Sequence, residues 1–254
     1  NTALSEIICL KFRRKIMINV TVWNEYRHEI AEEHVRKIYP DGMHNAIADF
    51  LKTEDDITVR TVTLDQENCG ITDELLEWTD VMLWWGHWAH DEVPDSIAQK
   101  VHNAVLDGMG IIFLHSGHYS KPFKFLMGTR CGLGGWRLPG EKARMWVTDM
   151  SHPIVQGIGR YLDVEKEEMY SEPFEIPNPE QVLFITAYEN SEVLRSGCCW
   201  QRGNGKIFYF QPGHEEYPVF YQKEIQTVIK NAVRWANPIY RVAKNGSPMQ
   251  PIIE

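Results

Sequence analysis

The chain has 254 residues, of which 43% are hydrophobic, and this length fits one large α/β domain or two small ones. Its formal net charge is −9 and it has no long basic run, which argues against a nucleic acid as partner. No apolar stretch approaches the roughly 18 residues that a membrane span requires, so a membrane is not expected either.

The cysteines and the first residues indicate a reduced, cytoplasmic protein. The five cysteines are odd in number and irregularly spaced, at Cys9, Cys69, Cys131, Cys198 and Cys199. Buried thiols are therefore expected rather than a disulfide framework. A short apolar patch precedes the basic run at 11–15, the reverse of the order in a signal peptide. We interpret residues 1–15 as an extension before the domain, with Met17 as a natural start.

The first half of the chain alternates between strand and helix patterns. Apolar runs predict strands, and apolar residues at helical spacing predict helices. The strands are expected at 16–23, 57–64, 80–85 and 110–114. The helices are expected at 43–51, 72–78, 94–108 and 121–127, with Thr72 as the cap of the second. This order is typical of a parallel sheet with helices on both faces.

The stretch from 128 to 205 breaks this pattern, because it is rich in Gly and Pro and its strand patterns are shorter. They lie at 144–147, 182–187 and 192–194. We interpret it as an inserted, elaborated region that carries a substrate-facing surface. Residues 206–210 return to the main sheet, and a closing helix follows with an inner face of Ile225, Val228, Ile229 and Ala232. A single domain is expected over 16–238, followed by an extended tail at 239–254 placed to contact a neighbouring subunit of a homo-oligomer.

Four of the strand patterns run directly into histidines. They are followed, in chain order, by His28, by His87 and His90, by His115 and His118, and by His214. In a parallel sheet the carboxyl ends of the strands lie along one edge, where open α/β folds place their ligand sites. Imidazoles gathered at that edge favour acid–base or metal chemistry over a purely structural role.

At 115–118 a strand turns sharply into a helix, which is the position of the exposed residue in a nucleophile elbow. That residue is His115, and no Gly-x-Ser-x-Gly pattern surrounds Ser116. A covalent acyl mechanism therefore lacks its obvious nucleophile. A second histidine three residues on, His118, favours a functional turn over a lone structural histidine.

The remaining polar groups are not equally strong candidates for functional residues. His214, which two glutamates follow, is the best single candidate for a general acid or base or a metal ligand, because a nearby carboxylate can fix its tautomer. His87 gains interest from its place after a central strand. The acidic loop around His28 ranks lower, because a mixed His/Glu loop is often only a solvated face. Spacing alone favours a solvated face for the acidic cluster at 167–172 too, but that cluster could lean over the sheet edge and supply a carboxylate. His152 is expected to be structural.

Nine tryptophans are many for a chain of this length. Most are expected to pack in the core or at its rim, Trp84 and Trp85 among them. Trp88 and Trp136 lie beside the candidate clusters, and for them we keep the hypothesis of an aromatic wall on which a sugar stacks.

Several longer motifs carry a family resemblance. They are Leu-His-Ser-Gly-His at 114–118, Ser-Lys-Pro-Phe-Lys-Phe-Leu-Met-Gly at 120–128, His-Pro-Ile at 152–154, Glu-Met-Tyr-Ser-Glu-Pro-Phe at 168–174 and Gly-Lys-Ile-Phe-Tyr-Phe-Gln-Pro-Gly-His at 205–214. Over roughly 17–238 the chain resembles the trehalose utilization protein ThuA family. The resemblance implies a flavodoxin-like, class I glutamine amidotransferase-like α/β fold and a role in bacterial catabolism of trehalose or related disaccharides.

The resemblance also implies which chemistry is missing. Glutamine amidotransferases have a cysteine at the elbow where this chain has His115, so hydrolysis of glutamine through a thioester should be lost. Their C-terminal histidine and glutamate resemble His214 and Glu216.

Two functional hypotheses follow, both with a small-molecule sugar as partner. The first is an enzyme that acts on a disaccharide or its keto derivative, with catalytic groups at His115, His214, Glu168 and Glu216. A divalent metal, zinc before others, would be held by His87, His115 and His214. Sugar contacts are expected at Trp88, Tyr170, Glu172 and His118. The alternative is a non-catalytic sugar-binding or regulatory protein that keeps an amidotransferase-like scaffold.

Overall fold

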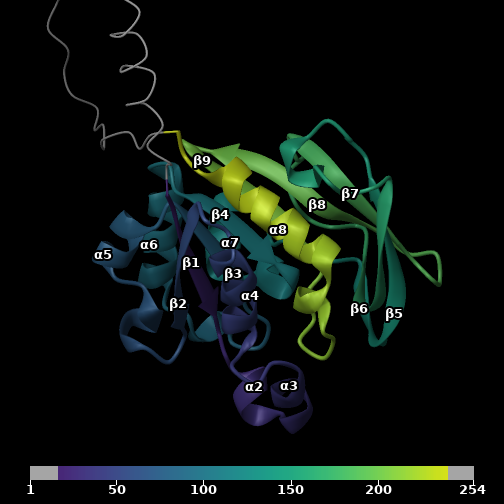
Figure 1. Ribbon diagram of the computed structural model, residues 1–254, viewed down its shortest axis with the longest axis horizontal. Coiled ribbons are helices and arrows are strands. Elements are labelled where there is room, and N and C mark those ends of the chain that lie inside the picture. The colour runs from purple at the N-terminus through teal and green to yellow at the C-terminus, as the bar shows by residue number, and fades with distance from the viewer. Residues whose placement is uncertain (1–16, 240–254) are drawn as a thin grey trace, which may run out of the picture.

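The computed structural model of the protein describes residues 17–239. They form one nine-stranded sheet in the order β2-β1-β3-β4-β9-β8-β7-β5-β6, with helices packed against it (Figure 1). The extension expected at 1–15 and the tail expected beyond 239 lie outside the described residues.

The first half of the sheet is parallel. Its strands are β1 (Ile18–Asn24), β2 (Ile57–Thr63), β3 (Val81–Trp85), β4 (Gly110–Leu114) and β9 (Gly205–Phe210). Every neighbouring pair among these five strands runs parallel, which confirms the predicted parallel sheet. All residues of β3 and β4 are buried, as central strands covered on both faces must be.

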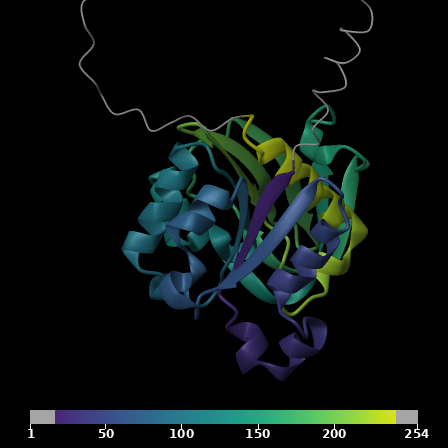
Figure 2. The same ribbon diagram turned by 60° about the vertical axis from the view of Figure 1, so that its left-hand side comes forward.

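Helices cover both faces of the parallel half (Figures 1 and 2). On one face lie α4 (Met43–Lys52) and α8 (Lys223–Ala236), which contact each other. On the other lie α6 (Asp95–Leu106) and α7 (Lys121–Met127), also in mutual contact. All four occur where apolar residues recur at helical spacing, so the predicted amphipathic helices are confirmed.

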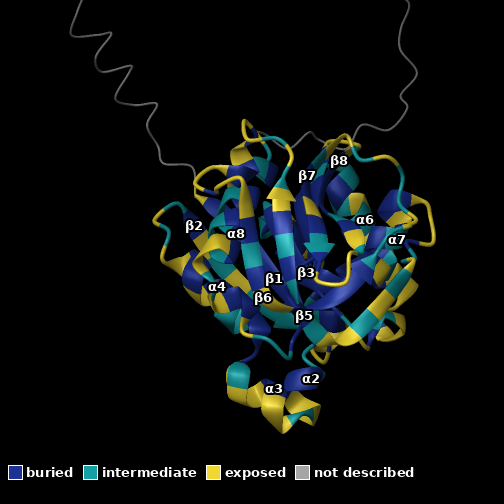
Figure 3. Cartoon of the chain, turned by 90° about the vertical axis from the view of Figure 1, so that its right-hand side faces the viewer, coloured by how far each residue is buried: buried dark blue, intermediate teal, exposed yellow. Residues whose placement is uncertain are grey.

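Shorter helices complete the first half. In α5 (Asp73–Trp78) the Thr72 hydroxyl accepts a hydrogen bond of 3.1 Å from the Leu75 amide, which confirms the predicted cap. Two helices, α2 (His28–Ala31) and α3 (Glu33–Ile38), project beyond the carboxyl end of β1, and Figure 3 shows α3 to be largely exposed. Single 3₁₀ turns are η1 (Glu67–Gly70), η2 (His90–Glu92), η3 (His115–Tyr119), η4 (Pro153–Val155) and η5 (Val219–Tyr221).

The second half of the sheet is antiparallel and corrects the prediction for 128–205. Instead of short strands, it has β5 (Gly135–Val147), β6 (Tyr161–Ser171), β7 (Gln181–Tyr188) and β8 (Val193–Arg202). These strands extend the main sheet beyond β9. The prediction missed β6 because its outer face is charged, and those charges pair across strands. Arg144 bonds Asp163 at 2.7 Å in this way.

The core lies between the sheet and its helices. The rings of Trp23 and Trp84 stack with centroids 3.8 Å apart, and Trp84 and Trp85 are at most 1% exposed, which confirms their packing role. The four cysteines from Cys69 onward are buried and free, as predicted. Within 17–239 no helix combines the length and apolarity that crossing a bilayer requires.

Candidate functional site

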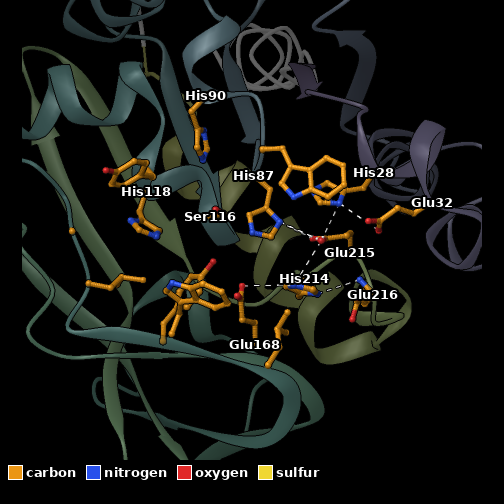
Figure 4. A pocket seen from close by; sticks show the side chains of 17 residues that line it. His28, Glu32, His87, His90, Ser116, His118, Glu168, His214, Glu215 and Glu216 are labelled. Carbon is orange, nitrogen blue, oxygen red and sulfur yellow. Dashed lines mark hydrogen bonds and ion pairs between the residues drawn. The ribbon is translucent and has the colours of Figure 1, made fainter.

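A pocket of about 660 Å³ lies at the carboxyl edge of the parallel strands (Figure 4). Its size is typical of small-molecule sites. It is lined by His28, Glu32, His87, Trp88, His90, Ser116, His118, Tyr119, Gly132, Leu133, Trp136, Leu138, Glu168, Tyr170, His214, Glu215 and Glu216. Side chains from both halves of the sheet thus meet in one pocket.

The four histidine-bearing strand ends meet here, as the parallel sheet predicts. The ring of His87 is central, with its centroid 5.0 Å from the ring of His28. The rings of His115 and His214 each lie 5.5 Å from that of His87. These histidines come from the ends of four different strands, so the sheet itself sets their spacing.

The turn at His115 is strained, with φ at +49°, a conformation that side chains other than glycine rarely adopt. The turn directs the ring toward His87 and His214, where it is fully buried and lies behind the residues that line the pocket. Its Nδ1 donates to the carbonyl oxygen of Gln211 at 3.1 Å, which leaves Nε2 toward a carboxylate oxygen of Glu168, also 3.1 Å away. Burial works to lower the pKa of His115, but the adjacent Glu168 carboxylate and the charge of Glu167 raise it above its usual value.

The two glutamates on β6 are buried, so of the two interpretations of 167–172 the solvated face is wrong for them and the cluster supplies carboxylates at the sheet edge. Glu167 is 0% exposed, and its carboxylate accepts hydrogen bonds from the amides of Gly213 and His214, at 2.8 and 3.2 Å. These two bonds satisfy the carboxylate in the absence of water. Burial raises its pKa to about 7. Glu168 is 3% exposed, and its Oε2 has no hydrogen-bond partner within the described residues.

His214 has a defined tautomer. The Glu216 amide donates to its Nδ1 at 3.2 Å, and because an amide can only donate, the proton of the neutral ring is on Nε2. That Nε2 lies 3.7 Å from Glu168 Oε2 and 3.6 Å from Glu215 Oε1. Burial lowers the pKa of His214 to about 4, so the ring is neutral at pH 7.

The carboxylate inside the histidine cluster is Glu215 rather than the predicted Glu216. Glu215 is 3% exposed, and both of its oxygens lie within 3.2 Å of Nδ1 of His87. Burial opposes its ionisation, but the bond with His87 holds the pKa of Glu215 well below its usual range. Glu216 lies at the rim, where it pairs with the exposed His34 at 3.1 Å. The family resemblance could not show which of these two adjacent glutamates lies in the histidine cluster.

The loop after β1 is also not a solvated face. The Glu25 carboxylate is 0% exposed and accepts hydrogen bonds from three successive amides, those of His87, Trp88 and Ala89, at 2.7, 2.7 and 3.0 Å. Three amide donors offset the cost of burying this carboxylate. His28 is 1% exposed and packs against the Trp88 ring at 3.7 Å. Glu25 thus fixes the segment that bears His87 and Trp88.

The other predicted residues divide into two groups. Trp88 and Trp136 line the pocket at 56% and 66% exposure, and Tyr170 and His118 line it as buried groups. Glu172 is not among the lining residues, because Arg195 binds its carboxylate at 2.7 Å. No local pattern indicates that pairing, which spans 23 positions. His152 accepts a hydrogen bond from the Ile154 amide at 3.2 Å, which confirms its structural role.

Within the described residues, three groups of donors have the spacing of a metal site, and the one with four members joins both halves of the sheet. The other two are His28 with His87 and Glu215, and Glu32 with His34 and Glu216. Single ligand atoms of His87, His115, Glu168 and His214 all lie within 4.8 Å of one another. Ligands around a tetrahedral zinc, at the usual bond lengths, are roughly 3.3 Å apart. The distances of 3.1 and 3.7 Å from Glu168 Oε2 to the two Nε2 atoms of His115 and His214 bracket that value.

Comparisons with known proteins agree with this architecture. The family model described as "ThuA: Trehalose utilisation" matches residues 19–236. A ThuA-like protein from Parabacteroides merdae is similar at 15% identity and a TM-score of 0.65, covering 90% of this chain and 94% of its own. A second, from Bacteroides uniformis, is 17% identical with a TM-score of 0.61 and coverages of 86% and 91%.

A more distant structure has the same fold. A glutamine amidotransferase from Thermotoga maritima is 9% identical with a TM-score of 0.54, covering 86% of this chain and 97% of its own. This likeness confirms the predicted amidotransferase-like α/β fold. No curated protein matches the chain significantly. From the match of the family model over nearly all described residues, we conclude that the chain belongs to the ThuA family of trehalose utilisation.

Proposed function

We propose that this protein is an enzyme that acts on a disaccharide or its keto derivative with the help of a divalent metal ion, zinc before others. His87, His115 and Glu168 would hold the ion. Two imidazoles and one carboxylate are a ligand set of catalytic zinc sites, which keep a further position open for water or substrate. The observation that carries the proposal is Glu168 Oε2, a buried carboxylate oxygen without a hydrogen-bond partner at ligand distance from His115.

The hydrogen bonds made by the proposed metal-binding histidines also favour them as ligands. Metal-binding histidines usually donate their other ring N–H to a carbonyl or carboxylate, which frees and orients the ligand nitrogen. His115 does this toward the Gln211 carbonyl, and Nδ1 of His87 faces the ionised Glu215. The raised pKa of His115 fits too, since a proton takes the place of the ion in a metal-free site.

His214 is better suited to a different role from the one first expected. Its Nδ1 is engaged by the Glu216 amide, so its Nε2 carries a proton instead of a free lone pair. We assign it the task of donating a hydrogen bond to a substrate oxygen beside the metal position. A neutral imidazole can polarise a carbonyl in this way without becoming charged.

The ion would supply one kind of chemistry, polarisation of a carbonyl or hydroxyl pair or activation of water. The protein's own groups would place the substrate and move protons. His214 donates to the reacting oxygen, and Tyr170, whose hydroxyl lies 3.2 Å from His115 Nε2, completes the polar wall.

The alternative function is non-catalytic sugar binding. The observation in its favour is that His115 stands at the elbow, where amidotransferases carry their cysteine, so the scaffold has lost that chemistry. Turnover of any keto-disaccharide by the purified protein would exclude this alternative.

The test is elemental analysis of purified protein together with turnover of keto-disaccharides. We expect about one zinc per chain in the wild type, little in His115→Ala, and retained zinc but lost turnover in His214→Ala. His102→Ala, on the outer helix α6, is the matched control and should match the wild type. Wild-type protein that stays free of metal after incubation with zinc would refute the metal assignment.

A further inference from the structure

The three groups of donors in the described part of the chain form a series from solvent to the interior. The outermost, which we call the rim group, consists of Glu32, His34 and Glu216. The middle group consists of His28, His87 and Glu215, and His87 also belongs to the innermost group, the candidate metal site. Burial increases along the series, since the His34 side chain is 56% exposed and His28 is 1% exposed.

The rim group lies at the mouth of the pocket. His34 Nε2 lies 3.1 Å from Glu216 Oε1 and 3.5 Å from Glu32 Oε2. Both glutamates line the pocket, and neither lysine nor arginine is among the described residues that do so. Carboxylates at the mouth of a cleft raise the local concentration of cations. The rim group therefore favours the first encounter with a divalent cation.

His28 connects the rim group to the interior. Figure 4 shows its ring next to both Glu32 and Glu215. Its Nδ1 lies 3.7 Å from Glu32 Oε2 and 3.2 Å from Glu215 Oε1. Neither nitrogen of this buried ring has a hydrogen-bond partner within the described residues. Because buried polar atoms are rarely left without a partner, His28 indicates that the pocket receives a ligand at this point.

Glu215 connects the middle group to the candidate metal site. Its carboxylate lies 3.1 Å from Nδ1 of His87, which is itself a proposed ligand. Its Oε1 also lies 3.6 Å from His214 Nε2, and that nitrogen is 3.7 Å from Glu168 Oε2. A cation passes along such a series when each position binds it well enough to receive it and weakly enough to release it.

We propose that the rim and middle groups are a loading path, along which Glu32, His28 and Glu215 bind the divalent cation in turn before it reaches the candidate metal site. This proposal rests on the proposed function, since it concerns entry to the metal site of that function. At equilibrium the ion resides at the inner site, so the expected content stays about one zinc per chain. A residue of the path changes a barrier that the ion crosses in both directions. It therefore alters the rates of uptake and release together and leaves the affinity unchanged.

The test measures zinc uptake by metal-free full-length protein with a zinc-sensitive dye, zinc release to a chelator, and the equilibrium affinity in the same buffer. Glu32→Gln keeps the size of a side chain that is 28% exposed, so the fold should be preserved. We expect uptake and release each to slow about 10-fold, with unchanged affinity. Glu33→Gln is the matched control, because Glu33 is the next residue, 72% exposed, and pairs with Lys37 outside the three donor groups. It should match the wild type.

A second variant interrupts the path at its buried link. His28→Phe keeps a ring against Trp88 but has no nitrogen, and we expect it to slow both rates at least as much as Glu32→Gln, again with unchanged affinity. Rates equal to those of the wild type in both variants, or slower uptake with unchanged release and therefore weaker affinity, would overturn the loading path and leave the metal site in place. Wild-type protein that takes up no zinc would refute the proposed function, and the loading path with it.

Discussion

The two halves of the sheet contribute different chemistry to one pocket. The parallel half provides imidazoles, because each of its central strands is short, fully buried and ends at the same edge. The antiparallel half provides Glu168, Tyr170 and Trp136 from the long strands β5 and β6. The nitrogen ligands of the candidate metal site all come from the parallel half, and its carboxylate, Glu168, comes from the antiparallel half. The comparison indicates that the site depends on β6 lying across the carboxyl edge of the parallel strands.

The largest effect is expected where the two halves meet. Glu168→Gln removes the only carboxylate contribution of β6 to the candidate ligand group. Loss of a residue that only hydrogen-bonds a metal ligand typically weakens metal binding about 10- to 100-fold. Because Glu168 would itself be a ligand, we expect the variant to weaken zinc binding by more than this and to abolish turnover. Glu165→Gln, on the same strand with an 80% exposed side chain, is the matched control. Zinc titration measures both, and equal affinity in the two variants would remove β6 from the metal site.

Within the parallel half, Glu25 is expected to act as a positioning residue. Glu25→Gln replaces one acceptor oxygen with a donor that faces backbone amides, which should shift the His87 segment. We expect an about 10- to 100-fold loss in metal affinity. Glu29→Gln is the control, because Glu29 is also buried and accepts from the Met43 amide, at 2.9 Å, outside the pocket. Similar metal affinities in the two variants would show that the effect is one of general stability.

The pH dependence separates the two kinds of histidine. The pKa of His115 is raised, so a proton competes with the metal, and affinity should fall as pH drops below that raised pKa. The pKa of His214 is lowered to about 4, so this ring adds no competition between pH 5 and 8. We expect metal affinity to change by about 10-fold per pH unit on the acid side. A flat profile from pH 5 to 8 would contradict His115 as a ligand.

The smallest effect is expected on the outer face of the antiparallel half. Arg144 and Asp163 form a partly exposed cross-strand pair. A double-mutant cycle with alanine at both positions should give a small coupling in chemical denaturation, within the range typical of exposed ion pairs. A coupling well above that range would mean that β6 depends on this pair for its position, and turnover would then fall with stability.

The sequence was informative where local pattern decides structure. Buried apolar runs located β1, β3, β4 and β9, and the residues that follow each run within four positions indicated which histidines share an edge. The same logic failed for β6, where alternating charge resembles a solvent-facing loop. The burial of Glu167 depends on the amides of Gly213 and His214, more than 40 positions away, and no local pattern encodes such a contact.

Local sequence pattern also could not show which individual carboxylates are buried in the site. Glu215 and Glu216 are adjacent, and only the turn after β9 decides that Glu215 faces His87. In the sequence Glu25 is one of several acids in its loop, and nothing nearby shows that three amides of the 86–89 segment donate hydrogen bonds to it. In both cases a contact distant in sequence decides whether a carboxylate is buried.

The most direct test of the account is a crystal soaked in zinc and measured at the zinc absorption edge. The account predicts one anomalous peak about 2.0–2.1 Å from Nε2 of His115, a ring nitrogen of His87 and a carboxylate oxygen of Glu168. A peak elsewhere in the protein, or none with the pocket open to solvent, would contradict the claim that the two halves of the sheet assemble a metal site.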